Sequence, residues 1–360
     1  MKKLHIQFVK SGHITAKSIL LENGNILLGA GVTLTDRYIQ RLKSMGIDTM
    51  FIEDPMTDDI IPDDVIRDET RRDAVRHVHK TMTELMDHPL TQKRTALPKL
   101  GSTFRDVFGS ILQDIQGRGN VLISLANLHT QDGYLFHHSV NVAVLAGILG
   151  ISKGYNRDQL MELGIGALLF DIGMTKIPVE VINKTTPITP EERELLQTHT
   201  KEGFDILRSQ HDISLLSAHC ALQHHERFDG TGYPRQLKQK EIHEYAQIVA
   251  IADVYDALTS ARSYRVGFTP GEASEFLFAS GNQYFNIDLV KHFLKHISIY
   301  PVSTTVQLNT GQIGVVAAVD PDANNRPIVR ITTEADGTPC KSPYEIDLQK
   351  HYNILIMKTL

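Results

Sequence analysis

The chain has 360 residues, a formal net charge of −5 and an ordinary globular composition without low-complexity tracts. This length permits about two or three domains, and the mildly acidic charge argues against a general DNA- or RNA-binding surface. Cys220 and Cys340 are the only cysteines, which excludes a disulfide framework and a cysteine zinc site. The apolar run 140–151 is too short to cross a bilayer and the N-terminus lacks a signal peptide, so we expect a cytoplasmic protein with no membrane span.

Residues 1–54 are expected to form a small α+β unit. The stretch "ILLENGNILL" (19–28) predicts two short strands around a Gly-Asn turn. The stretch "LTDRYIQRLKSMG" predicts a helix with Thr35 as N-cap and Gly46 just past its end. "IDTMFIED" then predicts a strand, and residues 55–64 are typical of a linker.

The linker leads into a helical region, and together they make up residues 55–119. Two apolar stripes at helical spacing indicate buried helix faces; they are Val75, Val78, Met82, Leu85 and Met86, then Phe104, Phe108, Ile111, Leu112 and Ile115. Packing between helices explains both stripes, and a dimer seam is the alternative.

Residues 120–297 are strongly helical, whereas residues 298–360 are β-rich. A helix start is well marked by Thr189, Pro190 and Glu192, which supply an N-cap, a first-turn proline and a capping-box glutamate. The last segment alternates β-branched runs with Gly, Pro, Asn and Asp, which predicts a small barrel or sheet. The sequence therefore predicts a mainly α fold: a helical core with a small N-terminal α+β unit and a small C-terminal β-rich unit.

Histidines and aspartates gather in five segments of the helical region. These segments are "FHHSVNVAVL", "LLFDIGMTKIP", "LLQTHTKEGF", "LQHHERFDGTGYP" and "IVAIADVYDAL". Each one alone could hold a hydrogen-bonded structural histidine or a buried carboxylate. Together, however, His and Asp ligands suit borderline or hard divalent ions, and a helical bundle can project them inward onto one site.

The order and spacing of these motifs resemble those of the HD-GYP family, a branch of the HD phosphohydrolase superfamily. The resemblance covers residues 120–297 and is most specific in "HHERFDGTGYP" and "IADVYDALTSARSYR". It implies an HD-type helical core with a binuclear site for divalent ions (Fe, Mn, Zn or Mg) and hydrolysis of cyclic di-GMP to pGpG or GMP. A homodimer or a signalling-protein partner is compatible with this family.

Carried over residue by residue, the resemblance assigns a first metal to His138, Asp171 and Asp253. Asp171 would bridge to a second metal, completed by His199, His224 and His225. His138 and Asp171 would be the residues closest to catalysis. The resemblance and the local charge also imply a set of substrate-binding residues, which are Arg227, Asp229, Gly230, Gly232, Tyr233, Pro234, Arg262 and Arg265. For any single basic residue, a solvated loop is the alternative explanation.

Two positions depart from the family pattern. The family has a histidine at position 170 and a phosphate-binding lysine at position 174, but this chain has Phe170 and Met174. Phenylalanine has no lone pair, and a thioether is too soft for Mn, Fe(II) or Mg. We therefore expect one good metal site and one weak or empty site. His137 cannot easily replace the lost ligand because it points about 100° away from His138 around the helix.

Three functions remain open at this point. The first is a slow, metal-dependent cyclic di-GMP phosphodiesterase with an impaired first metal site. The second is a catalytically inactive relative that senses cyclic di-GMP or binds a partner protein. The third, a metal-independent scaffold, fits less well because six of the seven expected ligands are present. The sequence does not choose between the first two.

Overall fold

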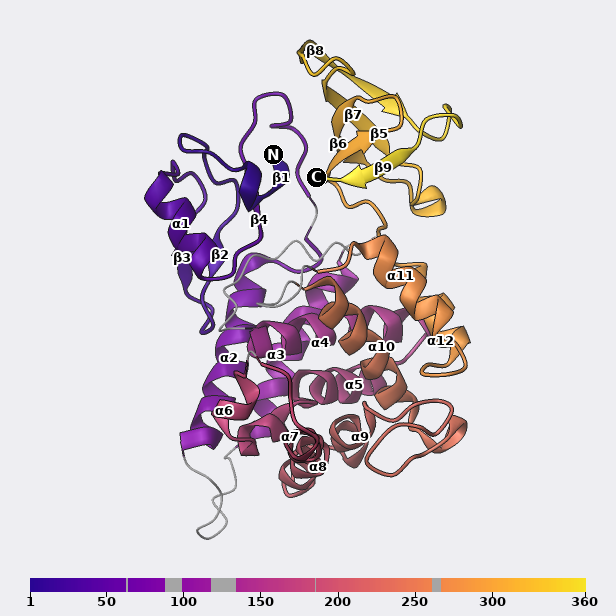
Figure 1. The fold of residues 1–360 in the computed structure, drawn as a ribbon. Helices are drawn as coiled ribbons and strands as arrows, with labels where there is room; N and C mark the ends of the chain where they lie inside the picture. Colours follow the sequence, from indigo (N-terminus) through magenta and orange to yellow (C-terminus); the bar gives the residue numbers. More distant parts are fainter. Residues whose placement is uncertain (63, 88–98, 118–133, 185, 261–266) are drawn as a thin grey trace.

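The computed structural model describes residues 1–62, 64–87, 99–117, 134–184, 186–260 and 267–360. Helices fill the lower part of the molecule in Figure 1, and the short strands gather at the opposite end. The mainly α fold class expected from the sequence is confirmed, with the β-rich unit at the C-terminus.

The N-terminal unit combines two short strand pairs and one helix. Its elements are β1 (Lys2–His5), η1 (Ile6–Phe8), β2 (Ile19–Leu20), β3 (Ile26–Leu28), α1 (Asp36–Ser44) and β4 (Thr49–Ile52). β1 pairs with β4 and β2 pairs with β3, both antiparallel. The predicted helix cap is confirmed, since the Thr35 hydroxyl accepts a hydrogen bond from the Tyr38 amide. β1 was not predicted from the sequence.

Long and short helices together form the core region of the molecule. Its elements are α2 (Asp68–Asp87), α3 (Leu100–Gln116), α4 (Tyr134–Ser152), α5 (Arg157–Leu169), η3 (Ile172–Lys176), α6 (Val179–Ile182), α7 (Pro190–Gln197), α8 (His199–Arg208), α9 (Leu215–Gln223), η4 (Gln239–Glu241), α10 (Glu244–Thr259), α11 (Pro270–Ala279) and α12 (Ile287–Leu294). The capping box predicted at Thr189 and Glu192 is present at the start of α7. The two predicted apolar stripes are buried on α2 and α3, except Met86, which is 38% exposed in the last turn of α2.

Helix α4 lies at the centre of this core and packs against α5 and α10. Its side chains are buried continuously from Phe136 to Gly150, as expected for a helix that is apolar on every side. The apolar run at 140–151 is extended by earlier residues into a helix that could cross a membrane by length and composition. In the part of the chain that the structure describes, it is the one such helix, and 83% of its apolar window is buried inside the molecule.

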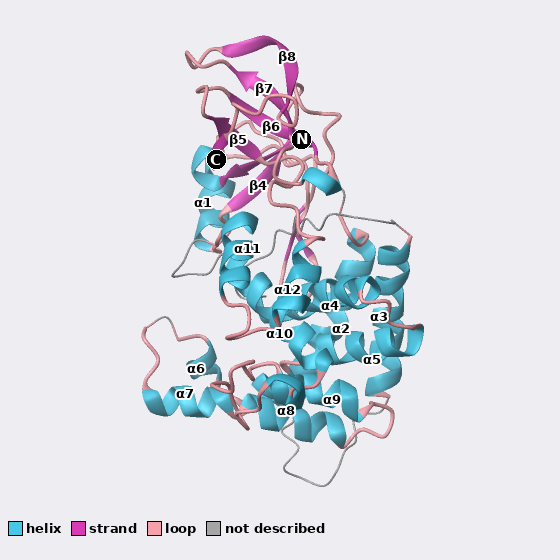
Figure 2. Ribbon diagram, turned by 90° about the vertical axis from the view of Figure 1, so that its right-hand side faces the viewer, coloured by secondary structure: helices cyan, strands magenta, loops and turns pink. Residues whose placement is uncertain are grey.

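The C-terminal unit is a five-stranded antiparallel sheet in the order β8-β7-β6-β5-β9. Its strands are β5 (Thr305–Leu308), β6 (Ile313–Ala318), β7 (Ile328–Thr333), β8 (Pro339–Asp347) and β9 (Ile356–Thr359), with the short helix η5 (Pro321–Ala323) between β6 and β7. The sheet touches the N-terminal unit, because the Lys3 amide donates to the Ser303 carbonyl and Lys3 forms a parallel bridge with Thr304. The two ends of the chain therefore meet at one end of the molecule (Figure 2).

Candidate metal centre

The bend after α5 places Asp171 against the start of α8. Asp171 precedes η3, and Gly173 lies within η3. A Cβ added at Gly173 would come within 1.9 Å of the carbonyl oxygen of His199. Only glycine therefore permits this close approach of η3 to α8, and the approach brings the Asp171 carboxylate to the His199 ring.

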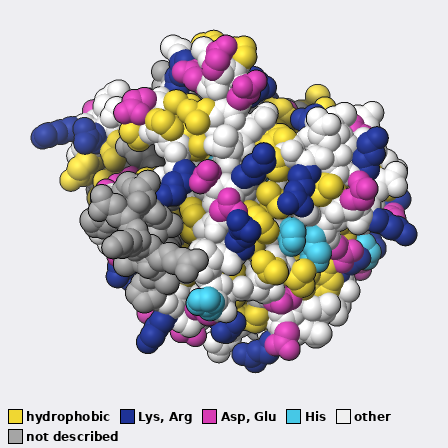
Figure 3. Space-filling view, turned by 90° about the horizontal axis from the view of Figure 1, so that it is seen from below, with side chains coloured by type: hydrophobic (Ala, Val, Ile, Leu, Met, Phe, Trp, Pro, Cys, Tyr) yellow, Lys and Arg dark blue, Asp and Glu magenta, His cyan; other side chains and the backbone are white. Residues whose placement is uncertain are grey.

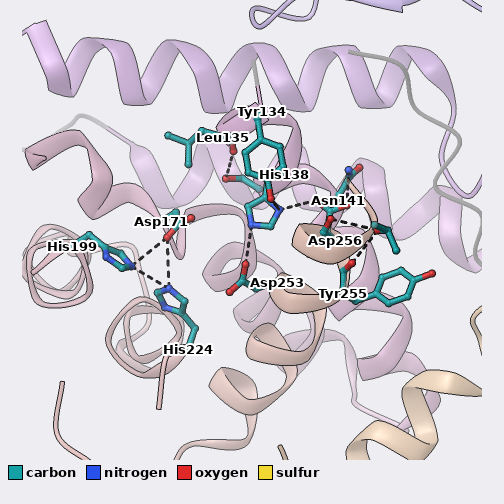
Figure 4. A network of polar contacts seen from close by, with 12 residues as sticks. Tyr134, Leu135, His138, Asn141, Asp171, His199, His224, Asp253, Tyr255 and Asp256 are labelled. Atoms are coloured by element: carbon teal, nitrogen blue, oxygen red, sulfur yellow. Dashed lines mark hydrogen bonds and ion pairs between the residues drawn. The ribbon is translucent and has the colours of Figure 1, made fainter. Parts of the chain in front are cut away.

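Asp171, His199, His224 and His225 form a cluster that we call the histidine half-site. Asp171 Oδ1 lies 3.5 Å from His199 Nε2 and 3.6 Å from His224 Nε2, and these two nitrogens lie 3.3 Å apart (Figure 4). One ring nitrogen from each of the three histidines lies within 4.8 Å of the corresponding nitrogens of the other two. Four ligands around one ion at about 2.1 Å would be separated by about 3.4 Å, so these distances suit a single divalent ion.

Main-chain carbonyls orient two of these rings. His199 Nδ1 lies 2.5 Å from the Leu196 oxygen, and His224 Nδ1 lies 3.0 Å from the oxygens of Cys220 and Ala221. An imidazole that donates from Nδ1 keeps its Nε2 lone pair for a metal, which is the arrangement seen around metal-bound histidines. Both Nε2 atoms face Asp171.

The charge states of three of the four members of the cluster also suit ligation. Burial alone would raise the pKa of Asp171, but the hydrogen bond from His224 and the neighbouring imidazoles hold it well below its usual range. Burial lowers the pKa of His199 and lowers that of His225 further. Burial also acts to lower the pKa of His224, but Asp171 raises it overall. The carboxylate is therefore ionised, and His199 and His225 are neutral, as ligands must be.

His138 and Asp253 lie in a second group, which we call the His138 half-site. His138 Nε2 is 2.9 Å from Asp253 Oδ1, and His138 Nδ1 is 2.7 Å from Asp256 Oδ2. Burial lowers the pKa of His138, but the hydrogen bonds to both carboxylates outweigh it and raise the pKa to about 10. The Tyr134 ring stacks on the His138 ring with centroids 4.9 Å apart.

Phe170 lies between the two half-sites. Its ring meets His138 edge-on at a centroid distance of 5.6 Å and His224 at 4.9 Å, and the side chain is fully buried. No ligand atom is therefore offered from this position, although it touches a histidine of each half-site. Met174 is partly buried and packs against the helical core.

His137 and His219 stay outside both half-sites. His137 Nε2 lies 3.0 Å from the Leu21 carbonyl oxygen of the N-terminal unit, and His219 lies beside Gln223 on α9. Neither replaces the missing histidine at position 170, which agrees with the expectation for His137 from helix geometry.

The loop after His225 is held in place by a buried carboxylate, Glu226. Its two oxygens accept hydrogen bonds from the amides of Arg235 and Leu237 at 2.7 and 2.9 Å. Gly232 packs so tightly that an added Cβ would lie 2.3 Å from the Arg227 nitrogen. Glu226 was not predicted from the sequence, although a glutamate next to two histidines that are candidate ligands is a reasonable candidate.

The other predicted loop residues have defined contacts. The Tyr233 ring stacks on His225 with centroids 4.8 Å apart, so one face of the ring is already occupied. Asp229 shapes the turn by accepting two hydrogen bonds from Thr231, and the Arg227 guanidinium lies 4.0 Å from the Tyr284 ring centroid. Gly230 has φ +85°, and Tyr233 is joined to Pro234 by a cis peptide bond. Arg262 and Arg265 lie outside the described residues.

The surface seen from below in Figure 3 mixes Lys and Arg side chains with acidic ones and exposed histidines. Near the metal centre, Arg227, Arg235 and Lys238 are exposed. A small anion could meet these cations.

Comparison with known proteins relates both the helical region and the C-terminal sheet to known families. Residues 120–289 match the family model described as "HD domain". The match takes in the helices that carry both half-sites. Residues 305–360, which form the C-terminal sheet, match "KOW domain associated with HD domain". The HD-type fold is shared with a solved HDG"Y"P protein, Bd1817 from Bdellovibrio bacteriovorus, at 19% identity and a TM-score of 0.51, covering 81% of this chain and 97% of that one.

Curated relatives of the HD domain are named as phosphodiesterases. The cyclic di-GMP phosphodiesterase PA4108 of Pseudomonas aeruginosa is 36% identical over 211 residues, which is 59% of this chain and 51% of the relative. A cyclic di-GMP phosphodiesterase of Thermotoga maritima is 34% identical over 207 residues, which is 57% of this chain and 55% of the relative. The chain thus spans about half the length of the curated relatives it matches.

Proposed function

We propose that this chain is a metal-dependent phosphodiesterase that hydrolyses cyclic di-GMP to pGpG or GMP. Its histidine half-site would hold one divalent ion, and its His138 half-site would be weakened by Phe170 and Met174. The relatives named as cyclic di-GMP phosphodiesterases support the reaction and the substrate.

One observation carries the proposal. His199 and His224 both direct Nε2 toward Asp171, and main-chain carbonyls fix their opposite ring nitrogens. Buried polar groups are costly unless they are satisfied, so a cluster of two buried imidazoles with a half-buried imidazole and a half-buried carboxylate calls for a ligand. A mixed imidazole and carboxylate set suits Fe, Mn or Zn, and Mg less well.

The residues of the chain would have separate roles in metal binding, phosphate binding and support of the loop. Asp171, His199, His224 and His225 would hold the ion, which when bound supplies a Lewis acid that polarises a phosphoryl oxygen and acidifies water. The exposed cations of the loop, Arg227 among them, would attract the phosphates. Glu226 would hold the loop in its shape over the site.

The weakness of the His138 half-site follows from its neighbours. His138 contributes the one imidazole of this half-site, and both its nitrogens already contact carboxylates. The position that would add a second imidazole is a phenyl ring. At position 174 a thioether replaces a cation that would offset the charge developing on the phosphate. We therefore propose slow turnover.

A second candidate is a catalytically inactive relative that senses cyclic di-GMP or binds a partner protein. The buried Phe170 ring between His138 and His224 favours it, because the ring fills the space between the half-sites with apolar atoms. The ordered loop at Glu226 would still allow ligand binding. A cytoplasmic location and either a homodimer or a signalling-protein partner remain part of the proposal in both cases.

The experiment that tests the proposal combines binding and turnover on one sample. The protein is loaded with Mn²⁺, its metal content is measured, and cyclic di-GMP binding is followed by calorimetry while products are separated by chromatography. We expect slow formation of pGpG or GMP that a chelator abolishes. Binding without any product in metal-loaded protein would establish the sensor instead, and absence of both would overturn the proposal.

A further inference from the structure

A chain of hydrogen bonds runs from α2 to His138. Arg71 Nη1 donates to Asn141 Oδ1 at 2.7 Å, and Asn141 Nδ2 donates to Asp256 Oδ1 at 2.9 Å. The other oxygen of Asp256 accepts the bond from His138 Nδ1 at 2.7 Å (Figure 4). Three helices, α2, α4 and α10, thus contribute to one connected network.

Each bond in this network has one possible direction. Arginine has only donors, so the Asn141 oxygen must face Arg71 and the amide nitrogen must face Asp256. A carboxylate accepts at both oxygens, so Asp256 can hold Asn141 with one oxygen and His138 with the other. The network therefore fixes the His138 ring with Nε2 toward Asp253.

Burial makes this orientation strong. His138, Asn141, Arg71 and Asp256 are each less than 5% exposed, so water does not compete for their bonds. A buried arginine is expensive unless its charge is compensated, and Asp64, Asp68 and Asp256 compensate the Arg71 charge. The matched HD domain begins at residue 120, so Arg71 extends the site beyond the domain.

We propose that Arg71, Asn141 and Asp256 are positioning residues that orient His138 for ligation in the His138 half-site. The catalytic consequence of this orientation rests on the proposed function, but the orientation of the His138 ring does not. Residues that orient a metal-ligating histidine typically change metal affinity or activity by about 10–100-fold. Substitution of Arg71, whose Nη1 bonds to Asn141, should therefore loosen the His138 ring.

The test reads the His138 ring by NMR in protein labelled with ¹⁵N-histidine, and the resonance is assigned by its loss in His138→Gln. Arg71→Met and Asn141→Leu should move the Nδ1 proton upfield and speed its exchange with water by about five- to tenfold, the effect of one lost buried hydrogen bond. Arg76→Met is the matched control, because Arg76 is exposed on the same helix and forms an ion pair with Asp73. Thermal unfolding checks that each variant is folded.

Two milder variants keep the test decisive if the apolar ones fail to fold. Arg71→Lys keeps the positive charge on a side chain of different length and geometry. Asp256→Asn keeps the side-chain shape but has one hydrogen-bond acceptor fewer. In both variants the Nδ1 proton resonance of His138 should move upfield. A His138 resonance that is identical in wild type, these variants and Arg76→Met would overturn the proposal. Turnover of cyclic di-GMP is measured on the same samples, with kcat expected to fall about 10–100-fold at unchanged KM. A shifted resonance in a protein that never turns over would refute the proposed function and leave the positioning network standing.

Discussion

The two half-sites lie side by side but are built in different ways. In the histidine half-site, main-chain carbonyls hold two imidazoles by Nδ1 and leave Nε2 directed at Asp171. In the His138 half-site, the single imidazole has a carboxylate at each nitrogen. The histidine half-site can offer imidazole nitrogens to an ion. In the His138 half-site, both nitrogens of the histidine already have hydrogen-bond partners within the protein.

Under the proposed function, this difference would let one substitution affect only half of a binuclear centre. Phe170 touches His138 and His224, yet the histidine half-site needs no ligand from position 170. The His138 half-site would need one. The predictions below test whether the two half-sites differ in function as they differ in structure.

The largest effect is expected from removing a histidine of the histidine half-site. His224→Ala should abolish tight metal binding and lower turnover about a thousandfold or more, because a bound ion contributes several kcal/mol to transition-state stabilisation. Metal analysis and cyclic di-GMP turnover measure both effects. His219→Ala is the control, since His219 lies on the adjacent helix α9 and bonds to Gln223 instead; equal losses in both variants would contradict the assignment.

Repair of the His138 half-site should give the next largest effect. The double variant Phe170→His, Met174→Lys should raise turnover on the order of a hundredfold, because one electrostatic group at the reacting phosphate is worth about 2.7–4 kcal/mol and the two substitutions are not additive. Affinity for cyclic di-GMP should hardly change. Turnover and thermal stability are compared with wild type, both loaded with Mn²⁺.

A folded, metal-loaded double variant that is no faster than wild type would contradict this account. The limit on turnover would then lie outside Phe170 and Met174, and the sensor function would become the better explanation. Thermal unfolding separates this result from a variant destabilised by a buried imidazole without a metal.

A smaller effect is expected in the loop that contacts the centre through Tyr233. Glu226→Gln loses one of two acceptors and leaves the amide of Arg235 or Leu237 without a partner, at a cost of about 1–3 kcal/mol. We expect KM to rise about tenfold while the metal content stays constant. Glu241→Gln is the control, because Glu241 also accepts a hydrogen bond from a main-chain amide, that of Lys238, but this bond is exposed to solvent. Loss of metal in Glu226→Gln would show that the loop supports the ion and not the substrate.

The smallest effect should come from the histidine next to His138. His137→Leu removes the hydrogen bond to the Leu21 carbonyl and should cost about 1 kcal/mol of unfolding free energy. Thermal unfolding measures this loss, and metal content should equal that of wild type. A reduced metal content would mean that His137 takes part in ligation after all.

Features with a local signal could be predicted from the sequence. The caps at Thr35 and Thr189 and the buried stripe of α3 follow from neighbouring residues alone. β1 was missed because this four-residue strand depends on pairing with β4, which lies at the other end of the N-terminal unit in the sequence. Met86 fits the apolar stripe of α2 but is exposed in the last turn of the helix, which the apolar pattern alone does not indicate.

In the candidate site, too, some residues have a local sequence signal and others depend on contacts that are distant in the sequence. Asn141 and Asp256 each lie three residues from a predicted ligand, His138 and Asp253, and this spacing on a helix could have identified them. Arg71 could not be identified, because nothing in its own segment indicates that the side chain reaches Asn141 across 70 positions. Likewise, the sequence shows that position 170 is a phenylalanine, but only the fold shows that its ring touches both half-sites.

The most direct test of the central claim is the number of ions that the two half-sites hold. Wild-type protein is loaded with Mn²⁺, dialysed against a chelator and assayed for metal, with His224→Ala treated in parallel. The account predicts one equivalent retained in wild type and none in the variant, with a second ion bound weakly or not at all. Two equivalents that survive the chelator would contradict the unequal half-sites, and none even after metal supplementation would favour a metal-independent scaffold.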